Sequence, residues 1–301
     1  MFNSLNNRGA AIAAPFSWPR SSGGGVRPIK QSALCALRPI PEPRVNTETT
    51  AGLAKVEVIK FDEGGLSSAF SEYVPSEQEF TLSVNDQFET SLYCAPHRVK
   101  SLVIGFLVGE GMLESEREFV AIETDLKHHI IRATVAPKAA SRMAARALSG
   151  PWGRLAEPEV SRKVDSTLSL KPEAIQKLAA SFKKLFLSLK SSEKMCYLAA
   201  FAQPDEILSY GEGFHRVNAL YRALGELVAS GVKPENRIAL ANFGLTKQIT
   251  LRLARAGVSF AITAAPPSNA AIELANQQYL CICTTSIGGQ LNVYSAPWRV
   301  L

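Results

Sequence analysis

From Arg237 to Leu301 the chain reads RIALANFGLTKQITLRLARAGVSFAITAAPPSNAAIELANQQYLCICTTSIGGQLNVYSAPWRVL, and this stretch decides the fold. Three short apolar runs alternate with two segments of helical periodicity. Strands that alternate with helices of this length are typical of βαβ units and predict a parallel sheet. The expected strands are Ile238–Ala241, Val258–Thr263 and Tyr279–Thr284, and the expected helices are Thr246–Ala256 and Ser268–Gln277.

The ends of these elements are marked by glycine. Gly257 follows the first helix at the position where a chain commonly turns left-handed. Gly288-Gly289 predicts a turn into a last strand, Leu291–Tyr294.

Three loops leave the carboxyl ends of the expected strands, where ligands bind in sheets of this kind. They are Asn242–Thr246, Ala264–Asn269 and Thr285–Gln290, and all are rich in small and polar residues. Ordinary turns would have the same composition, and the loops lack the full dinucleotide and P-loop fingerprints. The pattern therefore predicts a crevice without naming its ligand.

Composition narrows the class of protein. With 301 residues, 46% of them apolar, the chain can form one large domain or two small ones. No apolar run approaches the roughly 20 residues of a membrane span. Four of the six net positive charges lie in residues 1–50, so the folded body carries no basic footprint for nucleic acid. Five scattered cysteines suit a reducing compartment, which points to the cytoplasm.

The first half of the chain divides into three parts. Residues 1–50 are rich in Gly, Pro and small polar residues and are expected to be a disordered tail, with a transit peptide as the alternative. Residues 51–135 form a smaller β-rich part. Residues 136–171 are expected to be a long loop with a short helix at Ala139–Leu148. The expected elements of the β-rich part are strands at Val56–Phe61, Glu79–Val84, Gln87–Cys94 and His129–Val135 and a helix from His97 to Gly111. The turn signal Asn85-Asp86 predicts that the second and third of these strands form a hairpin.

Residues 172–301 form an α/β part. A helix is expected at Pro172–Leu189, a strand at Cys196–Phe201, and a second helix that ends at Gly231. Polar residues gather at the start of this second helix, where the helix dipole favours an anion. They are Glu212, His215, Arg216 and Asn218, and capping of the helix is the alternative explanation.

Five stretches taken together are similar to one family, the formate dehydrogenase accessory sulfurtransferases (FdhD). The order and spacing agree over about residues 56–301. The matching stretches are Val84–Asp86 with Ala95-Pro96 and Leu102–Met112; Gly211–Leu220; Asn242–Leu245 with Arg252–Gly257; Ala265–Ala270; and Gly288–Arg299.

The resemblance implies a fold and a function. The implied fold is a mixed sheet with helices on both faces, similar to the cytidine deaminases without their zinc, so no metal site is expected. The implied activity is transfer of persulfide sulfur from a cysteine desulfurase to molybdenum cofactor, the molybdopterin guanine dinucleotide, during maturation of formate dehydrogenase. The cofactor would be bound as cargo in a crevice of a homodimer.

The sequence departs from the family pattern at the residues that carry this chemistry. The family holds sulfur on a C-x-x-C in a mid-chain loop, whereas no cysteine occurs here between Cys94 and Cys196. The corresponding residues are Ser149–Arg154, which offer no thiolate. Family residues that would hold phosphate or pterin groups are also replaced. A histidine is replaced by Val217, and arginines are replaced by Leu245, Ile287 and Gln290.

The other cysteines of the chain are weak candidates to replace the C-x-x-C as sulfur carrier. Cys281 and Cys283 lie on an expected buried strand and favour a core role, and Cys196 is also on a strand. Cys94, beside a loop, is the most plausible exposed thiol.

Two hypotheses follow. The chain is an accessory protein for formate dehydrogenase maturation, or it is a non-catalytic relative that keeps the scaffold as a nucleotide-binding or partner module. No catalytic residue is assigned. The residues expected to face the cofactor are Glu212, Arg216, Asn218, Phe243, Gly244, Pro266, Ser268, Asn269, Thr285, Ser286, Ile287, Gly288, Gly289 and Gln290.

Overall fold

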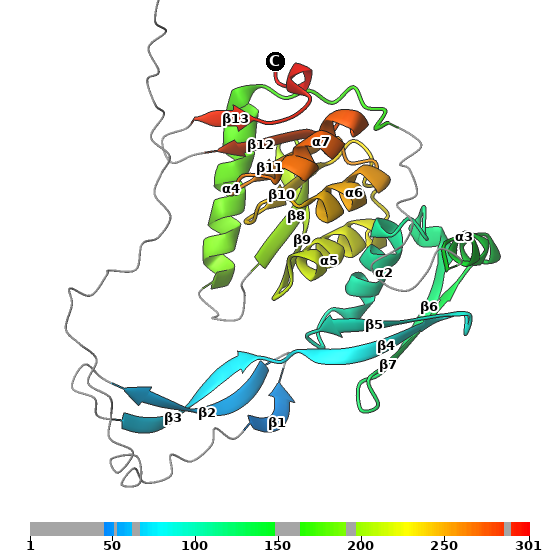
Figure 1. The fold of residues 1–301 in the computed structure, drawn as a ribbon, viewed down its shortest axis with the longest axis vertical. Helices are drawn as coiled ribbons and strands as arrows, with labels where there is room; N and C mark the ends of the chain where they lie inside the picture. Colours follow the sequence, from blue (N-terminus) through cyan, green and yellow to red (C-terminus); the bar gives the residue numbers. More distant parts are fainter. Residues whose placement is uncertain (1–44, 51–52, 62–66, 148–162, 191–196, 286–289) are drawn as a thin grey trace, which may run out of the picture. The chain divides into compact units, whose positions relative to one another are not determined.

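The structure is a computed structural model that describes residues 45–50, 53–61, 67–147, 163–190, 197–285 and 290–301. The strands in these ranges form three sheets, and the largest has the order β13-β12-β11-β10-β8-β9 (Figure 1). Strands β10, β11 and β12 are parallel, while β8, β9 and β13 run antiparallel to their neighbours. The bounds are β8 Tyr197–Gln203, β9 Glu206–Gly213, β10 Ile238–Ala241, β11 Phe260–Thr263, β12 Cys281–Thr285 and β13 Leu291–Val293.

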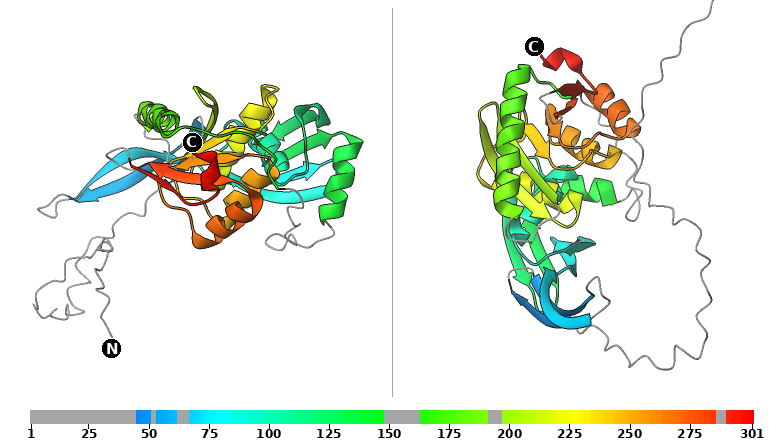
Figure 2. Two further views of the ribbon diagram at one scale, coloured as in Figure 1. Left: turned by 90° about the horizontal axis from the view of Figure 1, so that it is seen from above. Right: turned by 90° about the vertical axis from the view of Figure 1, so that its left-hand side faces the viewer.

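Helices cover both faces of this sheet. Helix α4 (Pro172–Lys190) packs its apolar side on one face, together with inward residues of β8, β10, β11 and β12. Helices α5 (Arg216–Ala229), α6 (Lys247–Arg255) and α7 (Asn269–Gln278) pack on the other face. Figure 2 shows α4 and α7 on opposite sides of the strands. Strands β8, β10, β11 and β12 are buried on both sides, which explains their continuous apolar sequences.

The second sheet has the order β5-β4-β7-β6. The hairpin of β4 and β5 turns at Asn85 and Asp86, whose φ angles of 52° and 53° lie in the left-handed region that tight hairpin turns use. The apolar face of this sheet shares one core with α2 and α5. The bounds are β4 Gln78–Val84, β5 Phe88–Cys94, α2 Val99–Gly109, η1 Glu116–Glu118, β6 Phe119–Asp125, β7 Ile130–Val135 and α3 Pro137–Ala147.

Two glycines let α2 and α5 cross closely. A Cβ atom on Gly105 would lie 1.8 Å from the carbonyl oxygen of Tyr221, and one on Gly225 would lie 1.7 Å from the carbonyl oxygen of Ser101. Any larger residue would therefore collide with the backbone of the opposite helix. This close crossing fixes the position of Tyr221 relative to α2.

The third sheet contains β1 (Val45–Thr50), β2 (Leu53–Phe61) and β3 (Ser67–Pro75), in that order. The ladder between β2 and β3 is regular over nine residue pairs, whereas a shift interrupts β1 between Asn46 and Thr49. Phe61, Phe70 and Tyr73 are exposed on this sheet.

The C-terminus is anchored by Arg299, which lies in η2 (Pro297–Arg299) and is only 4% exposed. Its Nη1 donates hydrogen bonds to the carbonyl oxygens of Ser166 (2.8 Å) and Leu168 (3.0 Å), and its Nε donates to that of Tyr279 (2.9 Å). A bridge between Leu170 and Val300 continues this contact. The segment that leads into α4 is thus held by the last residues of the chain.

Most of the expected elements are confirmed, including the parallel strands, the hairpin and the helices on both faces. Among the described residues, four strands were not expected, namely β1, β3, β6 and β9. Strand β1 lies within the stretch expected to be a disordered tail, and α3 occupies part of the expected loop. Residues Arg44–Leu301 form one compact unit, and residues 1–44 lie outside the described residues. Among the helices of the described segments, none has the length and apolar character needed to cross a membrane.

Candidate functional site

A cavity of about 790 Å³ lies between β5 and the first turns of α5 and α6, and we call it the tyrosine cavity. Tyr93, Tyr197 and Tyr221 line it, together with Arg216 and Asn218. Tyr93 comes from β5, Tyr197 begins β8, and the other three belong to α5. Aromatic rings and a cation on the same wall suit a flat, negatively charged ligand.

Two helix N-termini point their positive dipole ends at the tyrosine cavity. Helix α6 is capped by Thr246, whose hydroxyl oxygen accepts a hydrogen bond from the Ile249 N–H at 3.4 Å. Helix α5 begins after His215, which has an extended backbone. Arg216 adds a full positive charge, and its guanidinium lies 5.3 Å from the ring centre of Tyr197. The arrangement favours an anion.

Contacts between α5 and the neighbouring second sheet fix part of the cavity lining. Asn218 donates a hydrogen bond to the Tyr93 carbonyl oxygen at 2.7 Å. His215 lies 2.5 Å from a carboxylate oxygen of Glu77, which comes just before β4. The first turn of α5 is therefore tied to the second sheet.

A buried charged network supports the inner wall. The carboxylate of Glu110 accepts a hydrogen bond from Tyr221 at 2.6 Å and faces Arg252 at 2.6 Å and Arg255 at 3.3 Å. Burial lowers the pKa of Arg252, but the Tyr221 hydroxyl and the Glu110 carboxylate outweigh this effect, so the pKa is raised overall. Burial raises the pKa of Tyr221, and Glu110 raises it further. At neutral pH the wall thus contains a phenol and a permanent cation.

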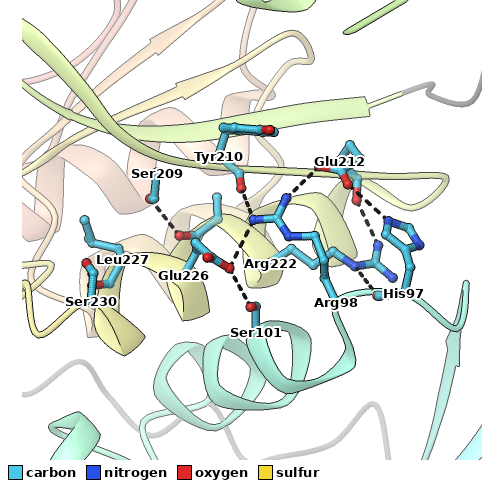
Figure 3. Close-up of polar contacts among 11 residues, drawn as sticks. His97, Arg98, Ser101, Ser209, Tyr210, Glu212, Arg222, Glu226, Leu227 and Ser230 are labelled. Atoms are coloured by element: carbon cyan, nitrogen blue, oxygen red, sulfur yellow. Dashed lines mark hydrogen bonds and ion pairs between the residues drawn. The ribbon is translucent and has the colours of Figure 1, made fainter. Parts of the chain in front are cut away.

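Glu212 takes no part in the tyrosine cavity. The sequence placed it at the start of a helix, but the structure places it on β9, with its carboxylate 2.9 Å from Arg98 and 3.1 Å from His97 (Figure 3). Burial raises its pKa, yet the hydrogen bond with His97 and the charge of Arg98 outweigh burial and lower it. Arg222 donates to the Glu212 carbonyl oxygen at 2.8 Å. Glu212 thus joins β9 to the start of α2.

A second cavity, of about 530 Å³, lies between α4 and the carboxyl ends of β10, β11 and β12, and we call it the α4 cavity. Asn242, Thr263 and Thr285 line it beside Phe182 and Lys183. This is the crevice that the parallel strands predict. It lies on the opposite face of the sheet from the tyrosine cavity, because α4 and α5 cover opposite faces. The expected site is therefore divided between two cavities.

The other expected residues that the structure describes lie outside the lining of both cavities. Phe243 is buried and meets the Tyr197 ring edge-on, with 5.6 Å between the ring centres. Gly244 allows close approach, since a Cβ atom there would lie 2.2 Å from the Pro266 carbonyl oxygen. Ser268 caps α7. Pro266, Asn269 and Gln290 are exposed and line neither cavity. The remaining expected residues lie outside the described residues; they are Ser286, Ile287, Gly288 and Gly289.

The thiols within the described residues are buried. Burial raises the pKa of Cys94 to about 11, although the charge of Arg222 opposes it, and raises that of Cys281 to about 12. The pKa of Cys283 is also raised by burial. The prediction that Cys94 is an exposed thiol is wrong, because it faces the core at 2% exposure. The core role of Cys281 and Cys283 is confirmed.

Sequence reasoning missed Tyr93, Tyr197, Tyr221 and Arg252 as cavity residues. Helical spacing offered a signal for Tyr221, which is three positions after Asn218 and so shares its side of α5. Tyr93 and Tyr197 lie on strands of different sheets, and only the tertiary fold brings them together.

Comparisons with known protein families and with known sequences both point to one family. The model of the FdhD/NarQ family matches residues 75–301. "Sulfur carrier protein FdhD" from Staphylococcus haemolyticus is 22% identical over 252 residues, covering 81% of this chain and 95% of that protein. The protein of the same name from Bacillus subtilis is 21% identical, covering 81% and 96%.

A solved structure has the same fold. The crystal structure of a protein assigned as a formate dehydrogenase accessory protein from Desulfotalea psychrophila superimposes with a TM-score of 0.63 at 18% identity. The match covers 83% of this chain and 99% of that chain. The family match spans most of the chain and includes both cavities, and on this basis the chain belongs to the FdhD/NarQ family.

Proposed function

We propose that this protein is an accessory factor for formate dehydrogenase maturation that binds molybdenum cofactor, in its guanine dinucleotide form, as cargo. Family membership and the names of the relatives support the maturation role. The observation that carries the proposal for this chain is the tyrosine cavity, which combines aromatic walls with Arg216 and two helix N-termini.

The residues present fit such a cargo in chemical type. Phosphate groups are bound well by helix N-termini and by arginine, and the aromatic side chains of Tyr93 and Tyr197 on the cavity lining offer apolar contact to a heterocycle. Arg216 has no carboxylate partner among the described residues, so its charge is available to a ligand. The α4 cavity, bordered by Thr285 before the expected cofactor loop, is the second candidate for part of the same ligand.

A second candidate function is favoured by the buried thiols. Cys94, Cys281 and Cys283 cannot form thiolates readily at neutral pH. A non-catalytic relative would use the same cavity to bind nucleotide or a partner without transferring sulfur. Cys35 and Cys196 lie outside the described residues, and sulfur transfer in this chain would have to use one of them.

The proposal includes the partners that the family implies. These are a cysteine desulfurase, a formate dehydrogenase and a second copy of this chain, in the reducing environment of the cytoplasm. The scattered cysteines support the compartment.

Complementation tests the maturation role. The full chain is expressed in bacteria that lack their own accessory protein of this family, and formate dehydrogenase activity is measured in extracts. We expect restored activity, a large loss with Arg216→Ala, and no loss with Arg132→Ala, which removes an exposed arginine from β7. A folded protein that restores no activity would contradict the maturation role.

Nucleotide binding separates the two candidates. Isothermal titration with GDP as the probe should show binding that Arg216→Ala weakens by at least about tenfold, the usual effect of losing one charge-assisted hydrogen bond. Restored activity that is lost in Cys35→Ser/Cys196→Ser would support sulfur transfer. GDP binding without restored activity would support the non-catalytic relative, and absence of both would refute both candidates.

A further inference from the structure

Strand β3 differs from the other strands at the sheet edges of the described residues. The edge of β5 is covered by Asn218, which binds the Tyr93 carbonyl oxygen, and that of β9 by Arg98, which binds the Tyr210 carbonyl oxygen. Strands β1 and β6 contain register shifts, and β13 has three residues. Bulges, covering side chains and short length are the usual devices that protect an edge.

Strand β3 has none of these devices. It is nine residues long, pairs regularly with β2, and carries one charge, Glu72. Residues 68–73 are all exposed, including Phe70 at 42% and Tyr73 at 57%. No side chain of the described residues donates a hydrogen bond to it. A long, regular, nearly uncharged edge is a template for another strand.

We propose that β3 pairs antiparallel with β3 of a second copy, so that the two three-stranded sheets become one sheet of six strands. This inference rests on the homodimer in the proposed function and names its surface. An antiparallel pair of identical strands has a two-fold axis, which closes the assembly at two copies.

The sequence of β3 is self-complementary in one register, in which Phe70 lies opposite Phe70 of the second copy. Directly opposed residues share one face of a sheet, so the two rings form a cross-strand aromatic pair. On their outer sides each Phe70 is paired with Val58 of β2. The centre of the new interface would thus be apolar across four strands.

The same register places opposite charges near each other. Ser68 comes opposite Glu72 of the second copy, and on its other side Ser68 pairs with Lys60. Lys60 and Glu72 of the second copy would therefore share one face, two strands or about 10 Å apart at the backbone, within reach of each other's long side chains. In the same register, Tyr73 of the second copy lies two strands away from Phe61 and on the same face, which brings two aromatic side chains near each other.

Other registers are poorer. A two-fold axis at Ser71 would bring Pro75, which has no N–H, into the ladder. An axis at Glu72 would oppose two carboxylates. The Phe70 register leaves Pro75 outside the paired strands.

Charge variants of Phe70 test the pairing. Light scattering of the full chain as it elutes from a size-exclusion column should give the molar mass of a dimer. In Phe70→Lys two positive charges would meet at the two-fold axis, and in Phe70→Glu two negative charges would meet there. Each variant should then be monomeric, with a dissociation constant at least about a hundredfold higher, as expected for opposed like charges in an interface. An equal mixture of the two variants should form a heterodimer. Val120→Lys, at a 64% exposed position on the β6 edge, is the matched control and should remain dimeric.

A second pair of variants keeps the test independent of any effect on folding at position 70. Glu72→Lys should weaken the dimer by opposing Lys60, and Lys60→Glu/Glu72→Lys should restore it. A monomeric wild type would overturn both the inference and the proposed homodimer. A dimer that persists in Phe70→Lys, or folded variants that stay monomeric when mixed, would overturn the β3 pairing alone.

Discussion

Replacing Gly105 with alanine should strain the crossing of α2 and α5. The new Cβ atom would lie 1.8 Å from the Tyr221 carbonyl oxygen, whereas unstrained contacts of this kind exceed about 3.2 Å, so the helices must separate by about 1.4 Å. Overpacking of this kind costs about 3 kcal/mol, and the better helix propensity of alanine returns about 1 kcal/mol. A net loss of about 2 kcal/mol lowers the Tm of a protein this size by roughly 4–8 °C.

The assay is thermal unfolding followed by circular dichroism, with Gly225→Ala as the reciprocal variant. Because both substitutions open the same crossing, their effects in the double variant should be less than additive. The helix shift also moves Tyr221, so GDP binding in the tyrosine cavity should weaken in parallel. A Gly105→Ala protein with an unchanged or higher Tm would refute the close backbone contact.

Three further predictions concern buried groups. Glu110→Gln should destabilise the protein by about 3–5 kcal/mol in urea unfolding, because Arg252 and Arg255 lose a buried counter-charge; an unchanged midpoint would exclude the network as a structural element. The lowered pKa of Glu212 stabilises the fold above its unfolded-state pKa of about 4.3, and this stabilisation is lost as the pH falls through the lower folded-state value. The Tm of Glu212→Gln should therefore fall less than that of wild type on acidification, and parallel pH curves would contradict the assignment. Cys94, Cys281 and Cys283 should resist iodoacetamide at pH 8 in the native protein and react in denaturant, as read by mass mapping; rapid native labelling would show that they are accessible.

The sequence was most informative where local pattern and tertiary role agree. The apolar runs of β10, β11 and β12 are continuous because these strands are buried on both faces, and Gly257 marks the end of the first intervening helix. The hairpin at Asn85 and Asp86 was likewise predictable, because few residues tolerate its left-handed angles. These elements establish the fold class and the position of the crevice.

The sequence was least informative where a residue's partner is distant. Small and polar residues predominate in β3, and residues 68–73 are all exposed in the part of the chain that the structure describes, so β3 lacks the alternating pattern of a half-buried strand. Glu212 follows a glycine and precedes a helix, which imitates a capping position, and only its pairing with His97 and Arg98 reveals its place on β9. The division of the site into two cavities depends on which helix covers which face, and periodicity does not encode that choice.

The anchoring role of Arg299 has a consequence for folding of the protein. The carbonyl groups of Ser166 and Leu168 find their donor only in Arg299, which lies 133 and 131 positions further along the chain. The segment that leads into α4 therefore lacks these hydrogen bonds until Arg299 has been synthesised and has folded against it. One wall of the α4 cavity thus depends on a contact of high sequence separation, a kind of contact that forms slowly during folding.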